Sequence, residues 1–115
     1  MTNTFPKPIL DLPEAKMPFP GCQGYLFQGE TQQIVFLKFH EDTELPVHTH
    51  ADQWEIVLEG SVEFTVNGEK RVYTKGESFY VEGGVPHSAS IKAGYLAIGF
   101  FNQPDRYKPK ASDEA

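Results

Sequence analysis

The sequence predicts an all-β fold, and three observations lead to that prediction. Glycine and proline contribute 10 and 9 of the 115 residues and separate short apolar runs. Apolar side chains at helical spacing always meet one of these breakers within a window of about eleven residues. Short alternating or apolar runs between turn signals are typical of a sandwich or barrel. We therefore predict strands at roughly residues 23–28, 32–39, 54–59, 61–66, 70–74, 78–82, 87–92 and 94–101.

Proline sets the character of the first twenty residues. Because proline lacks a backbone N–H and fixes its own φ, we predict that residues 1–20 form an extended arm without a helix. Residues 21–107 are the predicted barrel, and residues 108–115 are expected to be a solvated tail. The arm holds five prolines and four apolar side chains that can pack on the barrel or on a partner: Pro6, Pro8, Pro13, Pro18, Pro20, Leu10, Leu12, Met17 and Phe19.

Two of the predicted strands show how the sheets are covered. Residues 33–39 are apolar on both faces, as expected for a strand that is covered twice. Residues 61–66 alternate between apolar and polar side chains, which predicts one buried and one solvated face.

The pair Asn67-Gly68 predicts a tight hairpin after the alternating strand, since both residues tolerate positive φ. A two-residue loop would place Arg71 opposite Phe64 on the buried face. A three-residue loop would place Val72 there instead, and we favour that arrangement because valine is apolar.

Charge argues against a nucleic-acid partner. The net charge is −6 with histidine neutral, and the pI is near 5.1. A surface that binds nucleic acid needs a basic stripe, which this balance does not provide.

The sequence also predicts no association with a membrane. The longest purely apolar run extends from Ile34 to Leu37, far short of the roughly 20 residues that span a bilayer. The first residues lack the features of a signal peptide, so we expect a cytoplasmic domain. The single cysteine, Cys22, excludes an intrachain disulfide and a cysteine-cluster metal site.

Three of the four histidines stand where strand geometry can bring them together. His48 and His50 lie on a segment kept extended by the preceding proline, and a period of two points both imidazoles to one side. His87 follows directly after a Gly-Gly-x-Pro turn. Imidazole is the commonest ligand for divalent transition metals, so we predict a metal site and expect His40 to be a surface residue or a satisfied core residue.

These histidines lie in two ordered motifs that resemble those of the cupin superfamily. The first motif, His-x-His followed by Glu or Gln and then Gly, matches the segment from His48 to Gly60. The second matches the segment from Gly76 to Ile91, with Glu82 and Ile91 where proline and asparagine are usual. The resemblance covers most of the predicted barrel. It implies a jelly-roll fold, also called a double-stranded β-helix, with a metal inside its mouth.

The fourth ligand that the resemblance implies falls between two residues. The usual gap counted back from Gly60 lands on Gln53, whereas the gap counted forward from His50 lands on Glu55. Both share strand parity and can face inward. We favour Gln53, because strand pairing fixes the register before the glycine while the preceding turn can absorb a deletion. Glu55 remains the alternative. The implied metal ligands are His48, His50, Gln53 and His87.

Candidate walls of the site are inward residues of neighbouring strands: Phe36, Phe64, Tyr80, and Tyr95 or Phe100. An aromatic cavity with a cationic floor suits a small ligand with an apolar face and an anionic or carbonyl end. Glu55 and Tyr80 are candidate catalytic residues for proton transfer, with Tyr95 and metal-bound water as further candidates. Arg106 is a candidate anchor for a carboxylate; the alternative is an exposed arginine paired with Asp105.

The segment around Arg106 also resembles a Pro-x-Arg motif of pectin-degradation cupins, which linearise unsaturated uronate sugars. Pro104 and Arg106 match that motif. The catalytic aspartate of those proteins corresponds to Phe100 here, and a phenyl ring transfers no proton. The anchor is therefore present without the acid–base group, and we do not assign that activity.

Three hypotheses for the function follow. The first is an enzyme that uses Fe, Mn, Ni, Zn or Cu as a Lewis acid on a small carbonyl or carboxylate compound, for isomerase or lyase chemistry. The second is an Fe(II)-dependent dioxygenase, and the third is a non-catalytic module or sensor for a small molecule. The resemblance also implies a homodimer, with the arm and Trp54 as the expected contacts.

Overall fold

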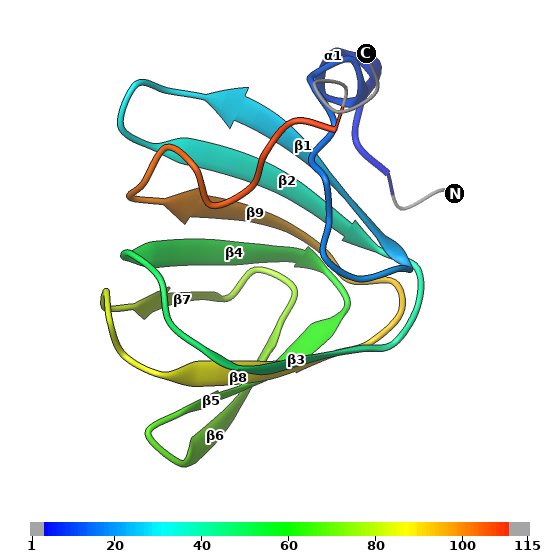
Figure 1. Cartoon of the computed structure of the whole chain (residues 1–115). Coiled ribbons are helices and arrows are strands. Elements are labelled where there is room, and N and C mark those ends of the chain that lie inside the picture. Colours follow the sequence, from blue (N-terminus) through cyan, green and yellow to red (C-terminus); the bar gives the residue numbers. More distant parts are fainter. Residues whose placement is uncertain (1–3, 111–115) are drawn as a thin grey trace.

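The computed structural model describes residues 4–110 and contains two antiparallel sheets that face each other (Figure 1). The five-stranded sheet has the order β1-β2-β9-β4-β7, and the four-stranded sheet has the order β3-β8-β5-β6. The strands, in chain order, are β1 Cys22–Gln28, β2 Gln33–Phe39, β3 Thr43–His48, β4 Gln53–Glu59, β5 Ser61–Val66, β6 Glu69–Thr74, β7 Ser78–Val81, β8 His87–Ile91 and β9 Leu96–Phe101. This jelly-roll arrangement confirms the predicted all-β class.

One strand, β3, was not predicted. It contains Pro46, which cannot donate a hydrogen bond to a neighbouring strand, and its burial does not alternate. The strand forms nonetheless because it lies at the edge of the four-stranded sheet and pairs with β8 alone. Edge positions tolerate proline, and the register shifts between Leu45 and His48.

The hairpin between β5 and β6 has a two-residue loop, so the favoured three-residue loop is wrong. Val66 pairs with Glu69 and Phe64 with Arg71. Val72 is 59% exposed, because β6 is an edge strand whose outer face is uncovered. Burial of an apolar residue was therefore a misleading guide to register in this hairpin.

The hydrophobic core fills the space between the two sheets. Its aromatic and aliphatic side chains come from inward positions on both sheets, including the fully buried Val35, Val57 and Ala97. The core occupies the barrel along its length and leaves a small cavity at one end, where the loops after β3 and before β8 meet.

The N-terminal arm contains one helical turn, which corrects the expectation of a fully extended arm. Helix α1 spans Lys7–Leu10, and Pro8 lies in its first turn, where a backbone N–H has no partner within the helix. The arm covers part of the outer face of the five-stranded sheet. Phe5 is buried there, with its ring centroid 5.5 Å from that of Phe36 on β2. The strand β2 is thus fully buried on its inner face, while its outer face is half-buried and the arm covers it at Phe36.

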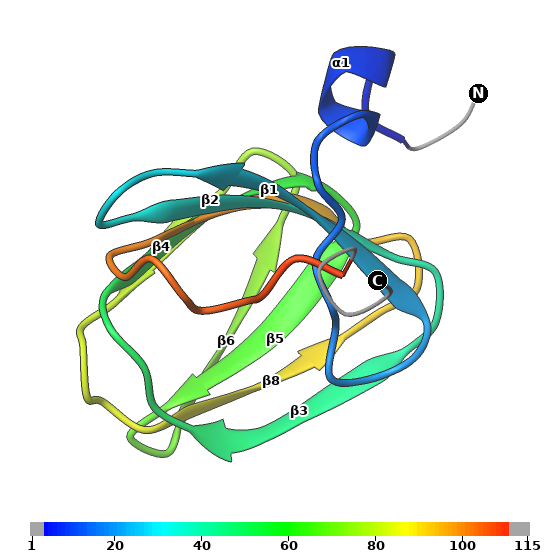
Figure 2. The same ribbon diagram turned by 45° about the horizontal axis from the view of Figure 1, so that its top comes forward.

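The arm then runs beside the C-terminal segment (Figure 2). The Lys16 N–H donates to the Lys108 carbonyl at 2.8 Å, and the Lys110 N–H donates to the Glu14 carbonyl at 2.7 Å. Of the predicted solvated tail, residues 108–110 are thus exposed yet paired through their backbone, while residues 111–115 lie outside the described residues. Within residues 4–110, no helix has the length and hydropathy of a membrane span.

Candidate metal centre

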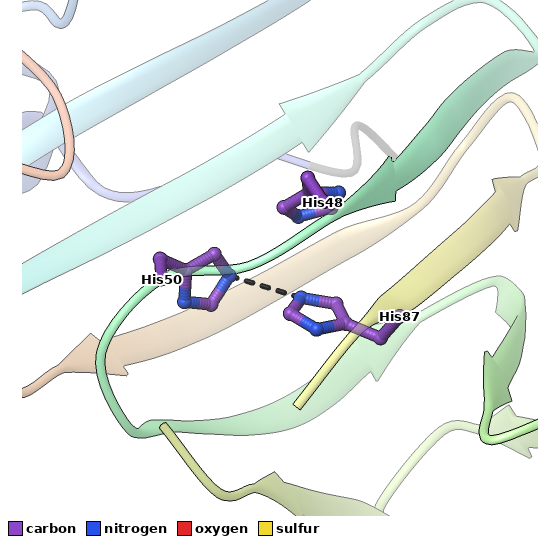
Figure 3. A group of neighbouring side chains, drawn as sticks. All are labelled: His48, His50 and His87. Atoms are coloured by element: carbon purple, nitrogen blue, oxygen red, sulfur yellow. Dashed lines mark hydrogen bonds between the residues drawn. The ribbon is translucent and has the colours of Figure 1, made fainter. Parts of the chain in front are cut away.

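The three histidines singled out in the sequence meet at one end of the barrel (Figure 3). His48 ends β3, His50 lies in the loop that follows, and His87 begins β8. His48 and His87 are direct partners in the sheet. One ring nitrogen of each lies within 4.8 Å of those of the other two, so the predicted convergence is confirmed. His40 is exposed and stands apart from this group.

Hydrogen bonds between two loops hold the histidines together. The Gly84 N–H donates to the His50 carbonyl at 3.0 Å. Gly84 has a φ of +81°, a conformation that glycine adopts without strain. The neighbouring Gly83 N–H donates to the Asp52 carboxylate at 2.6 Å. Asp52 therefore ties the loops together.

The backbone fixes which nitrogen of each imidazole faces the centre. Nδ1 of His48, His50 and His87 lies 2.7, 2.8 and 2.9 Å from the carbonyl oxygens of Pro46, Ala51 and Val85. A carbonyl oxygen only accepts hydrogen bonds, so each Nδ1 carries the proton and each neutral ring keeps its lone pair on Nε2. Hydrogen bonds of this kind orient the histidine ligands of metals.

Two of these lone pairs point at each other. Nε2 of His50 and Nε2 of His87 are 3.0 Å apart, as the dashed line in Figure 3 shows. With both rings neutral, this contact has two acceptors and no donor. A cation that accepts both lone pairs removes the conflict, and about 3 Å is a normal spacing for adjacent ligands with bonds of about 2.1 Å.

Burial favours the uncharged form of these rings. It lowers the pKa of His50 to about 4, with smaller contributions from the Arg106 guanidinium and the neighbouring imidazoles. Burial also lowers the pKa of His87, and His48 and Arg106 add to that effect. Neutral imidazole is the form that binds a metal.

Gln53 and Glu55 both face inward, as strand parity predicts, and both are buried. The Gln53 side-chain amide donates to Glu55 Oε1 at 2.8 Å, and the Tyr95 hydroxyl donates to Glu55 Oε2 at 2.5 Å. Each oxygen of the Glu55 carboxylate therefore has a protein donor. Burial raises the pKa of Glu55 to about 7, and the two hydrogen bonds partly oppose that shift. Burial and the neighbouring Glu55 raise the pKa of Tyr95, which keeps its hydroxyl a donor.

Arg106 lies beside the histidines. Its guanidinium is 4.6 Å from the ring centroid of Tyr107 and 5.7 Å from that of Phe101. The Gln33 side chain holds the backbone next to it, because its amide donates to the Tyr107 carbonyl and its oxygen accepts from the Tyr107 N–H. Arg106 Nε is the one buried side-chain polar atom of residues 4–110 without a hydrogen-bond partner.

Several predicted wall residues lie elsewhere. Tyr80 is 61% exposed and pairs with the exposed Trp54, so it faces away from the cavity and we remove it from the candidate catalytic residues. Phe36 and Phe100 also lie on the outer face of the five-stranded sheet. These three were assigned to the wrong face because the sequence did not fix the register of their strands. Phe64 does line the cavity.

Four aromatic walls of the cavity were not predicted from the sequence: Phe19, Phe39, Phe101 and Tyr107. Phe101, one residue beyond the predicted Phe100, lines the cavity, and its ring centroid is 5.5 Å from that of His50. Phe19 of the arm also lines it and stacks on Phe39, with ring centroids 6.0 Å apart. The alternation of β9 could have revealed Phe101, whereas no local pattern places the arm over the barrel mouth.

The two-sheet jelly roll and its histidine cluster define the class of protein. A family model of the cupin domain matches residues 34–94, more than half of the chain. The protein therefore belongs to the cupin family, as its two motifs indicated.

Several named proteins are similar to this chain. Quercetin 2,3-dioxygenase of Bacillus subtilis is 31% identical over 101 aligned residues, which take in 71% of this chain and 30% of that protein. The chain thus spans less than a third of the length of this curated relative. KdgF from a Halomonas species is 27% identical, with a TM-score of 0.69 over 80% of this chain and 86% of the other.

Two further solved structures share the fold. An RmlC-like cupin from Shewanella frigidimarina is 29% identical, with a TM-score of 0.70 over 82% of this chain and 86% of the other. Salicylate 1,2-dioxygenase from Pseudoaminobacter salicylatoxidans, solved with gentisate, is 21% identical. Its TM-score is 0.67 over 82% of this chain and 30% of the other.

Proposed function

We propose that this protein is a metal-dependent enzyme in which His48, His50, His87 and Gln53 bind one divalent transition metal. The observation that carries the proposal is the orientation of the three imidazoles. Each Nδ1 is held by a backbone carbonyl, and the Nε2 atoms of His50 and His87 meet at 3.0 Å. Three nitrogen donors and one oxygen donor suit Fe, Mn, Ni, Cu or Zn.

Gln53 is the better candidate than Glu55 for the fourth ligand. Its amide nitrogen is occupied by Glu55, which leaves its carbonyl oxygen free to bind a cation. Both oxygens of Glu55 already accept hydrogen bonds. Glu55 is thus a positioning residue, which orients the Gln53 side chain by accepting a hydrogen bond from its amide. Glu55 was a candidate catalytic residue, and we now propose that it acts only through Gln53.

Arg106 is the proposed anchor for the substrate. No ion pair engages its guanidinium within residues 4–110, and its Nε is buried without a partner. A planar guanidinium binds a carboxylate through two parallel hydrogen bonds. When bound, the metal would supply Lewis acidity that polarises a carbonyl or carboxylate group. The substrate is therefore a small carbonyl or carboxylate compound, for isomerase or lyase chemistry.

Metal analysis tests the proposed centre. We expect protein purified without a metal-affinity tag to contain about one transition metal ion per chain. His48→Ala should lose it and His40→Ala should keep it, since His40 lies on the surface. Equal metal content in the two variants would contradict the assignment. An anomalous density map at the barrel mouth would then distinguish Gln53 from Glu55 as the fourth ligand.

An Fe(II)-dependent dioxygenase is the second candidate. It is favoured by the 31% identity to quercetin 2,3-dioxygenase. Dioxygen consumption by the protein reconstituted with Fe(II), compared with the same protein loaded with Zn, tests it. Consumption that requires both Fe(II) and an organic substrate would favour the dioxygenase over the Lewis-acid enzyme. Saturable binding without any turnover would favour a non-catalytic sensor.

We also propose that the chain forms a homodimer through the outer face of the five-stranded sheet. Five paired residues form a row across all five strands there. The row consists of Phe27, Ile34, Phe100, Trp54 and Tyr80. Four of these are large side chains with considerable exposure, and exposed apolar patches of this kind mark interaction sites.

A further inference from the structure

Two neighbouring spaces with shared lining residues lie at the candidate metal centre, and they differ greatly in size. The interior cavity has a volume of about 30 Å³. A volume of this size accommodates only water-sized groups, so the bulk of an organic ligand has to lie outside this cavity. An entrance pocket of about 350 Å³ lies next to it, near the lower end of the range of about 300–1,000 Å³ for small-molecule sites.

The two spaces share the residues through which a ligand would pass. His48 and Arg106 line both of them, as do Phe19 and Leu45. A ligand can therefore place a reactive end at the histidines and Arg106 only if the rest of it lies in the entrance pocket. The walls of that pocket then decide which ligands bind.

Those walls are apolar. Pro18 and Phe19 of the arm form one side, and Leu45 and Pro46 of β3 form the other. The Phe19 ring is held in place by stacking on Phe39. None of these side chains carries a hydrogen-bonding group, so the middle of the pocket offers no side-chain partner to a hydroxyl group.

The polar side chains of the entrance pocket belong to His48, Arg106 and Glu44. His48 and Arg106 lie at the inner end. Glu44 also borders the pocket, but its carboxylate accepts a hydrogen bond from the Ser90 hydroxyl on the outer face of β3 and β8. A carboxylate is attracted to Arg106, whereas a second carboxylate on the same ligand meets no further arginine or lysine among the residues that line the pocket.

We propose that the substrate is a monocarboxylate with an apolar, aromatic or aliphatic body, and that Phe19 is a specificity-determining residue. This inference rests on the function proposed above, because it takes Arg106 as the anchor. The apolar body packs between Phe19 and Pro46. A hydroxylated body of the same charge would lose hydrogen bonds to water there and gain none.

Calorimetric titration of the protein with its resident metal tests this with three probes. Benzoate is an apolar monoanion, glucuronate is a hydroxylated monoanion, and phthalate is an apolar dianion. We expect benzoate to bind at least about tenfold more tightly than either of the others, a ratio that a single apolar group can give. Glucuronate or phthalate binding as tightly as benzoate overturns the proposal, and so does no binding of any probe.

Matched variants test the role of Phe19. Phe19→Ala should weaken benzoate binding at least about tenfold and leave glucuronate binding unchanged. Val72→Ala truncates an exposed apolar side chain on the edge strand β6, which lines neither space, and should have no effect. An equal loss in both variants overturns the role of Phe19. If Phe19→Ala fails to fold, Phe19→Gln keeps most of the volume, and its amide should shift the preference towards glucuronate. An unchanged preference in Phe19→Gln overturns the role.

Metal content separates this proposal from the proposed function. Protein that contains one metal per chain but does not prefer benzoate contradicts the specificity alone. Protein without metal that still prefers benzoate contradicts the metal-dependent function alone, since Arg106 and Phe19 are not metal ligands.

Discussion

Gln53, Glu55 and Tyr95 show how single residues behind the candidate ligands prepare the site. The Tyr95 hydroxyl and the Gln53 amide each donate to one oxygen of the buried Glu55 carboxylate. This chain of hydrogen bonds fixes the side-chain amide of Gln53, so that its carbonyl oxygen faces away from Glu55. The site is thus oriented from within the core of the barrel.

The contribution of the hydroxyl can be measured directly. Tyr95→Phe leaves Glu55 Oε2 buried without a donor, so we expect a loss of about 1–3 kcal/mol in the free energy of unfolding. Urea denaturation gives this value. Tyr73→Phe is the matched control, because Tyr73 packs against the core through its ring, whose centroid is 4.8 Å from that of Phe79, and we expect a change within about 0.5 kcal/mol. A similar loss in both variants would contradict the role of the hydroxyl.

The sequence predicts the inward direction of Gln53 and Glu55 but not their different roles. Strand parity alone places both in the cavity. What separates them is Tyr95, which lies far along the chain on the segment before β9 and reaches Glu55 across the sheet. Contacts between residues 40 positions apart leave no local pattern, whereas the motif spacing of the three histidines was sufficient to predict their convergence.

At the scale of elements, the hairpin of β5 and β6 depends on its turn. Asn67 and Gly68 have φ values of +53° and +79°, the positive values that a two-residue hairpin loop requires. The turn sequence was therefore a better guide to register than the apolar side chain of Val72. An edge strand need not bury its apolar residues, which is why that guide failed.

Substitution in this turn should have a purely conformational cost. A Cβ added to Gly68 meets nothing within 4 Å, yet its φ is unfavourable for alanine. We expect Gly68→Ala to lower the free energy of unfolding by about 1–2 kcal/mol, measured by chemical denaturation. Asn67→Gly keeps the conformation accessible and should change it by less than about 1 kcal/mol. A neutral Gly68→Ala would show that the turn relaxes to another type.

At the scale of the whole molecule, the candidate metal centre brings together residues of both sheets and of the loop between β3 and β4. The three histidines come from the end of β3, the next loop and the start of β8, and Gln53 begins β4 in the other sheet. A metal held by these residues would bind the folded chain alone and would therefore stabilise it.

Thermal melting measures this linkage. At a free metal concentration of about 100 times the Kd, we expect a gain of about 2.7 kcal/mol in the free energy of unfolding and a rise of several degrees in Tm. Chelation should reverse the rise. His87→Ala should abolish the response and His40→Ala should retain it. A rise of the same size in His87→Ala would indicate metal bound elsewhere on the surface.

The row of five paired residues on the outer face of the five-stranded sheet is the proposed contact between two chains. Trp54 lies in this row between Phe100 and Tyr80 and is 41% exposed. We expect sedimentation to show a dimer at micromolar concentration and Trp54→Ser to be monomeric. Val47→Ser alters an exposed apolar side chain on the opposite sheet and should leave the dimer intact. A monomeric unmodified protein would contradict the homodimer.

The backbone pairing of Glu14–Lys16 with Lys108–Lys110 connects the arm to the segment that follows Arg106. Phe19 and Arg106, the two proposed ligand contacts, therefore lie on chain segments that pair with each other, while His48 and His87 belong to strands of the barrel. The segment before Arg106 also bonds to the loop that carries His50, since the Ala51 N–H donates to Gln103 Oε1. Substitutions in the two terminal segments can therefore change which ligands bind while the fold of the barrel stays the same.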